Sequence, residues 1–144
     1  MSKKLGLLLV AFMSLTPATL ASDFVSESNL TGFQLPNGAL ELTDDDFSSA
    51  MVENLDDVAT FLGGHCKYHE LLYWEGNPAT IAKNLNAKIP NTFTYKSLGV
   101  GDFNDGSDYD AYEQFVLKSP KVWYSGVWFQ GDDKATLAWC SVYK

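Results

Sequence analysis

Residues 122–143 of this 144-residue chain decide the fold: VWYSGVWFQ (122–130), GDD (131–133) and KATLAWCSVY (134–143). The two outer stretches are rich in aromatic and β-branched residues, which favour strands. The short segment between them, Gly131-Asp132-Asp133, is typical of a hairpin turn. The sequence therefore predicts a C-terminal β-hairpin, and with it an antiparallel sheet built mainly from the last third of the chain.

A first helix is predicted upstream of this sheet. Thr43 is expected to cap it, and the acidic residues Asp44 to Asp46 then lie where the positive end of a helix dipole favours them. Gly63-Gly64 ends the helix. Its apolar residues recur at helical spacing: Phe47, Met51, Leu55, Val58 and Leu62.

A second helix is predicted from Asn77-Pro78, because asparagine is a favoured cap and proline is tolerated in the first turn. Ile81, Leu85 and Ile89 form its apolar face, and Pro90 ends it. No repeat or linker divides residues 22–144. We therefore predict one α+β domain with two helices in its N-terminal half and an antiparallel sheet.

The other segments predict shorter elements. Alternating residues predict a strand, a turn and a strand over 33–42, and a further strand over 92–98. Residues 65–74 fit a helix or a strand. Residues 99–110 are expected to form a long loop, and the polar segment 22–31 is expected to be frayed.

The first 21 residues are typical of a secretory signal peptide. Lys3 and Lys4 precede an apolar run from Leu5 to Leu15, and small residues lead to a cleavage point after Ala21. The run of about 11 apolar residues is too short to span a bilayer. We therefore expect export to the periplasm.

Export determines how the cysteines and the charge are interpreted. Cys66 and Cys140 are the two cysteines, and an even number in an exported chain predicts a disulfide. Removal of the signal leaves 8 basic and 18 acidic residues, a net charge of −10. Such a charge repels nucleic acids and anionic membranes and attracts basic proteins or cations. Neither a nucleic acid nor a membrane is an expected partner.

The sequence gives little support for a catalytic function. His65 and His69 have the spacing of HExxH zinc hydrolases, but Cys66 stands where that motif requires a glutamate as general base. No G-x-S-x-G elbow, Walker loop or dinucleotide fingerprint occurs in the sequence. We predict a protein that is not an enzyme and that uses no cofactor or metal.

The acidic segment from Asp102 to Asp110 leaves calcium binding open as an alternative. An EF-hand loop needs oxygen ligands at positions 1, 3 and 5, glycine at 6 and glutamate at 12. Counted from Asp102, Gly106 falls at position 5 and Glu113 at 12, so the glycine is one position early. A solvated loop, or a loop presented to a basic partner, is the main expectation.

Aromatic residues are frequent, with four tryptophans and seven tyrosines. On alternating strands, half of those in the hairpin are expected to face away from the core. Exposed tyrosine and tryptophan are common anchors of protein interfaces. Two segments combine aromatic and acidic groups and are predicted to bind a partner. They are Trp74, Glu75 and Asn77 in one segment, and Asp105, Asp108, Tyr109 and Asp110 in the other.

The segment from Trp128 to Leu137, followed by Cys140, resembles a motif of the periplasmic inhibitors of C-type lysozymes. Gln130 stands where that family has a lysine, and the two predicted helices do not suit that family's all-β barrel. We therefore transfer neither its fold nor its inhibitory residues.

The whole chain is similar in profile to the periplasmic immunity proteins of type VI secretion, which neutralise cell-wall hydrolases. The shared features are small size, export, acidity, a single disulfide and the lack of catalytic motifs. The resemblance implies a protein that blocks a secreted peptidoglycan hydrolase with a basic cleft, through acidic and aromatic loops. The alternative is a secreted module that binds a sugar or calcium. The oligomeric state, a homodimer included, stays open.

Overall fold

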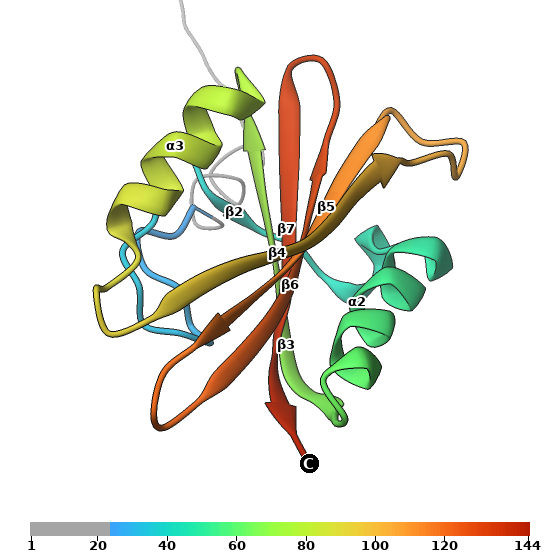
Figure 1. Cartoon of the computed structure of the whole chain (residues 1–144). Helices are drawn as coiled ribbons and strands as arrows, with labels where there is room; N and C mark the ends of the chain where they lie inside the picture. Colours follow the sequence, from blue (N-terminus) through green and yellow to red (C-terminus); the bar gives the residue numbers. More distant parts are fainter. Residues whose placement is uncertain (1–23) are drawn as a thin grey trace, which may run out of the picture.

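Six antiparallel strands form one sheet in the order β2-β3-β7-β6-β5-β4 (Figure 1). The structure is a computed structural model that describes residues 24–144, so the predicted signal peptide at 1–21 lies outside the described residues. Within residues 24–144, no helix is both long and apolar enough to cross a membrane. The elements are β2 (Leu40–Glu41), the 3-10 turn η2 (Asp44–Asp46), α2 (Ser49–Phe61), β3 (His65–Glu75), α3 (Pro78–Lys88), β4 (Thr94–Asp102), β5 (Ala111–Lys118), β6 (Trp123–Gln130) and β7 (Lys134–Tyr143). The predicted α+β class is confirmed.

Strands β6 and β7 form the predicted hairpin at the centre of the sheet. Their pairing runs from Gln130 opposite Ala135 to Tyr124 opposite Ser141. The Gly131 N–H donates to the Lys134 carbonyl at 3.0 Å and closes the turn. Since β7 also pairs with β3, and β6 with β5, both hairpin strands have hydrogen-bonded neighbours on both edges.

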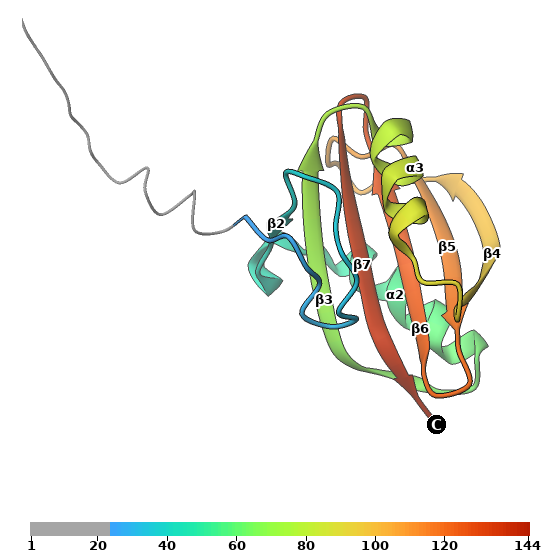
Figure 2. The ribbon, with the colours of Figure 1, turned by 90° about the vertical axis from the view of Figure 1, so that its left-hand side faces the viewer.

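The two helices cover opposite faces of this sheet (Figures 1 and 2). Neighbouring residues of one strand therefore enter different cores: Trp128 packs on the α3 side and Phe129 on the α2 side, and both are buried. The prediction that half of the hairpin aromatics face away from the core is wrong, because each face has its own covering helix. The buried helix residues are Met51, Leu55, Val58 and Ala59 of α2, and Pro78, Ile81 and Leu85 of α3.

Both predicted helices are present, but the first begins later than expected. Ser48, not Thr43, caps α2, and its side-chain oxygen accepts a hydrogen bond from a backbone N–H in the first turn at 3.3 Å. Thr43 is instead the N-cap of η2, where it forms a capping box with Asp46. Helix α3 begins as predicted, with Asn77 accepting from the Thr80 N–H at 3.0 Å.

The strands also differ in extent from the prediction. Residues 65–75 form a strand, β3, which resolves the helix-or-strand alternative. Strand β4 continues to Asp102, because a bulge between Ser97 and Gly99 lets the chain go on pairing with β5. The loop predicted over 99–110 is therefore limited to 103–110.

The segment before β2 is docked on the sheet rather than frayed. Ser28 is 2% exposed, and its hydroxyl donates to Glu70 Oε1 at 2.6 Å. The Asn29 backbone N–H donates to Glu70 Oε2 at 2.8 Å, and Trp139 Nε1–H donates to Oε1 at 2.8 Å. The buried Glu70 carboxylate thus ties the N-terminal segment to β3 and β7.

The predicted strand, turn and strand over 33–42 is mostly replaced by other pairings. Gln34 forms an isolated bridge with Glu27, and Leu40 bridges Phe24. The short β2 pairs with β3 instead of folding back on residues 33–35. Phe33 and Leu35 nevertheless lie in the α3-side core.

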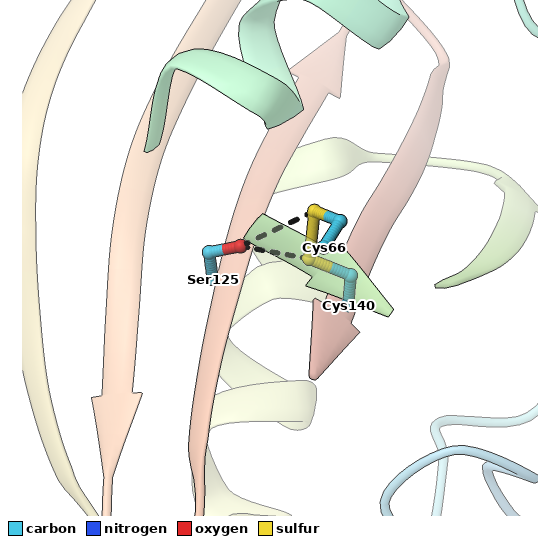
Figure 3. Close-up of a disulfide and its surroundings, with 3 residues drawn as sticks. All are labelled: Cys66, Ser125 and Cys140. Carbon is cyan, nitrogen blue, oxygen red and sulfur yellow. Dashed lines mark hydrogen bonds between the residues drawn. A yellow bond between two sulfur atoms is a disulfide. The ribbon is translucent and has the colours of Figure 1, made fainter. Parts of the chain in front are cut away.

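The predicted disulfide between Cys66 and Cys140 joins the neighbouring strands β3 and β7 (Figure 3). The two Cα atoms are 5.4 Å apart. The Ser125 hydroxyl on β6 lies 3.0 Å from Cys140 Sγ and 3.9 Å from Cys66 Sγ. Disulfides persist in oxidising compartments, which agrees with the expected export.

Replacing Cys66 and Cys140 together with alanine is expected to lower the free energy of unfolding. The bridge spans 74 residues and restricts the unfolded chain, an effect of about 4 kcal/mol in the chain-entropy model. Urea unfolding of the variant beside the oxidised and reduced native chain measures this. Identical urea midpoints for all three samples would contradict a stabilising role.

Replacing Glu70 with alanine is expected to cost about 3 kcal/mol of stability, because three donors, two of them on buried residues, lose a charged acceptor. The matched control is Glu41→Ala, whose exposed carboxylate accepts from the Asn29 side chain at 3.3 and 3.4 Å. This control is expected to change stability by less than about 1 kcal/mol. Urea midpoints of the two variants are compared, and equal losses would argue against the special role of Glu70.

Candidate functional site

Three segments that are distant in sequence meet at one end of the sheet, at the top of Figure 1. They are the β3–α3 junction, the β4–β5 loop and the β6–β7 turn. The Gly76 N–H donates to the Asp133 carbonyl at 2.7 Å, which joins the junction to the turn. The Asp110 N–H donates to the Gln130 carbonyl at 3.0 Å, which joins the loop to β6. Both segments predicted to bind a partner therefore lie at the same end of the sheet, on either side of the β6–β7 turn.

This end of the sheet carries a concentration of carboxylates. We call it the acidic end and define it by six residues: Glu75, Asp105, Asp108, Asp110, Asp132 and Asp133. All are exposed except Asp105, which is partly buried. Asp132 and Asp133 were predicted as turn residues but not as site residues. The pairing of β3 with β7 places their turn beside Glu75.

Asp105 is held in place by two other parts of the chain. Its Oδ2 accepts from the Ser48 hydroxyl at 2.7 Å, and its Oδ1 accepts from the Ser107 N–H at 2.9 Å. Burial raises the pKa of Asp105, but the hydrogen bonds from Ser107 and Ser48 outweigh it and leave that pKa below its ordinary value. The loop is thereby anchored to the N-terminus of α2.

Tyr109 and Lys134 fix the other side of the loop. The Tyr109 hydroxyl is hydrogen-bonded to the Thr136 hydroxyl, and burial raises its pKa. Lys134 Nζ lies 2.9 Å from Asp108 Oδ2 and 5.0 Å from the centre of the Tyr109 ring. The hydrogen bond to Asp108 raises the pKa of Lys134. The loop is therefore held in a defined conformation that still presents Asp108, whose side chain is 85% exposed.

The other residues predicted to bind a partner have different environments. Trp74 is 1% exposed and its Nε1–H donates to the Pro36 carbonyl at 3.1 Å. The expectation that this loop presents Trp74 is corrected, because the side chain is buried in the α3-side core. Asn77 caps α3. Glu75 and Asp110 are exposed, as a binding role requires.

The two histidines do not share a face. A bulge at Tyr68, where φ is +56°, shifts the register of β3 between Lys67 and His69. His65 and His69 therefore lie on opposite faces of the strand. His69 Nε2 is 2.8 Å from Asp44 Oδ1. Within residues 24–144 no three histidine, cysteine or acidic side chains are grouped so that they could hold a metal ion.

A second feature was not anticipated from the sequence. A hollow of about 400 Å³ lies between α3 and strands β4, β5 and β6. Residues from four separate elements and from β7 surround it, so local sequence patterns carried no signal for it. The aromatic residues in its wall are Tyr95, Phe115, Trp128 and Trp139.

No family model matches this chain, and neither the curated proteins nor the solved structures contain a significant match. Functional inference therefore depends on the chain's own geometry and chemistry.

Asp105→Ala is expected to destabilise the protein by about 1 kcal/mol at neutral pH, because two hydrogen bonds to a carboxylate are lost. Since the pKa of Asp105 is lowered in the folded state, its contribution is complete above the ordinary value of 3.8 and is lost as the pH falls below it. Urea unfolding between neutral and strongly acidic pH should show the deficit shrinking. Asp110→Ala is the control, and a pH-independent deficit for Asp105→Ala would contradict this account.

Proposed function

We propose that this protein is a periplasmic immunity or inhibitor protein, which uses its acidic end to bind a basic surface of a secreted peptidoglycan hydrolase. The observation that carries the proposal is the convergence of three acidic segments on one end of the sheet. The disulfide and the signal-like N-terminal sequence agree with a role outside the cytoplasm. In this proposal the protein acts by binding and not by catalysis.

The distribution of charge supports a preferred orientation toward such a partner. Four lysines lie at the opposite end of the sheet, where β3 begins and where β5 and β7 end. These residues are Lys67, Lys118, Lys121 and Lys144. The acidic end is thus separated from a group of lysines at the other end of the sheet. A charge separation of this kind steers an approaching basic protein toward the acidic end and raises its association rate.

The rigidity of the acidic end supports binding as well. Asp105 is tied to Ser48, and Tyr109 to Thr136. Interface loops that are already ordered lose less conformational entropy on association. Asp110, Asp132 and Asp133 remain exposed on this scaffold and are available to basic groups of a partner.

The sequence left two alternatives open, calcium binding and sugar binding, and the structure bears on each of them differently. Calcium binding by the loop is disfavoured, because Asp105 already accepts two hydrogen bonds and Asp108 pairs with Lys134. For sugar binding, the hollow beside α3 offers a candidate surface separate from the acidic end.

Reversing two charges of the acidic end, as Asp110→Lys with Asp132→Lys, is expected to slow association with the target about tenfold at low salt. The partners to test are purified basic muramidases and any secreted hydrolase encoded beside this gene. Association and dissociation rates are measured by biolayer interferometry at low and physiological ionic strength. Thermal stability should be nearly unchanged, because both side chains are exposed.

The matched control is Asp56→Lys with Asp57→Lys on α2, which changes the net charge equally. Asp56 and Asp57 lie about 13 Å along the axis of α2 from Ser48, the residue that contacts the loop. Equal slowing by both pairs would mean that only the net charge matters. Failure of the native protein to bind or inhibit any hydrolase of the panel would remove the proposal.

A further inference from the structure

Helix α3 covers only part of its face of the sheet (Figure 2). The hollow of about 400 Å³ lies beside this helix. One wall consists of helix residues, including Lys83 and Asn86, and the other is Tyr95 of β4. The sheet forms the base through Phe115 and Trp128. A hollow of this size is in the usual range for small-molecule sites.

The aromatic part of the wall is fixed by the packing beneath it. The Tyr95 ring stacks on the Phe115 ring, with centroids 5.5 Å apart, and Tyr95 is 47% exposed. A Cβ atom on Gly126 would overlap the Phe115 ring. The glycine therefore allows that ring to pack directly against the β6 backbone. Trp128 is supported by Trp74, at a centroid distance of 6.0 Å. The hollow thus has rigid aromatic surfaces.

The rim is polar and its hydrogen-bonding capacity is only partly used. The Tyr95 hydroxyl donates to Glu113, and Trp128 Nε1–H donates to Gln130 Oε1 at 3.2 Å. Gln130 accepts this bond through its carbonyl oxygen, which leaves its amide N–H groups as donors at the rim, and the Asn86 side chain on α3 is exposed. Donors and acceptors therefore stand together at the edge of an aromatic surface.

A second hollow of about 420 Å³ adjoins the first and shares Glu113, Trp128 and Gln130 with it. It continues toward Val100 and Asp102 on β4, and Val100 is 73% exposed. The two hollows together form a groove that begins at α3 and reaches the edge strand of the sheet. A groove that extends from α3 to the edge strand suits a ligand of more than one ring.

The chemistry of the rim decides between a cation and a neutral ligand. Glu113 beside aromatic rings would attract an amine, but Lys83 lies on the same rim and Glu113 already accepts from Tyr95. A pyranose has an apolar face of C–H groups for the aromatic surface, and hydroxyls that both donate and accept. We propose that this groove binds a neutral oligosaccharide, with one sugar ring on the exposed face of Tyr95 and its hydroxyls on Glu113, Gln130 and Asn86.

The test is an NMR titration of the disulfide-bonded protein with chitotetraose, maltotetraose and cellotetraose, each to about 10 mM, which detects dissociation constants into the millimolar range. At least one sugar is expected to shift the Trp128 indole N–H and the Gln130 amide signals with saturation. Gln130→Ala and Asn86→Ala are each expected to weaken that binding several-fold. Asn84→Ala is the control, because Asn84 lies on α3 but borders a different hollow, beside Pro36.

Three outcomes would overturn the proposal. One is the absence of saturable shifts with all three sugars, and another is binding that neither Gln130→Ala nor Asn86→Ala weakens. The third is saturation by tetramethylammonium in place of the sugars, which would assign the groove to cations. The Asp110→Lys and Asp132→Lys variant should titrate with sugar like the native protein, so failure of the acidic end and failure of the groove are distinguishable.

Discussion

Strand β7 is buried on both of its faces and hydrogen-bonded along both of its edges, and this constraint shapes the rest of the molecule. A sheet with two apolar faces needs cover on each side. Helix α2 covers one face, and α3 with the N-terminal segment covers the other. A helix is about 10 Å wide, which is about two strand spacings, so one helix cannot cover six strands. The groove beside α3 lies where that face of the sheet remains uncovered.

The buried carboxylate of Glu70 completes the cover on the α3 side. A buried carboxylate is costly unless donors surround it, and here Ser28, Asn29 and Trp139 supply them. Two of the three donors belong to the N-terminal segment, so docking of that segment satisfies the charge. The same docking brings Phe33 and Leu35 into the core. Within the described part of this segment, residues 24–31, the polar composition therefore reflects a polar contact with the sheet.

Local signals in the sequence predicted local structure well. The hairpin, the cap at Asn77 and the pairing of Cys66 with Cys140 each depend on a few neighbouring residues or on export chemistry, and all were confirmed. The role of Ser28 and the burial of Trp74 depend on partners about 40 residues away, Glu70 and Pro36. Neither could be predicted without the sheet order. The two acidic segments were recognisable by composition, but their meeting with Asp132 and Asp133 follows from the topology.

The acidic end and the groove meet at Gln130. Its backbone carbonyl accepts from Asp110, a residue of the acidic end, while its side chain lines both hollows of the groove. A protein bound over Asp110 and Asp132 would therefore stand at the mouth of the outer hollow. If both proposals hold, a sugar in the groove and a protein at the acidic end affect each other's affinity by the same factor, since coupling between two binding equilibria is reciprocal. With the peptidoglycan hydrolase proposed as the target, such coupling would make inhibition depend on whether the wall material itself occupies the groove.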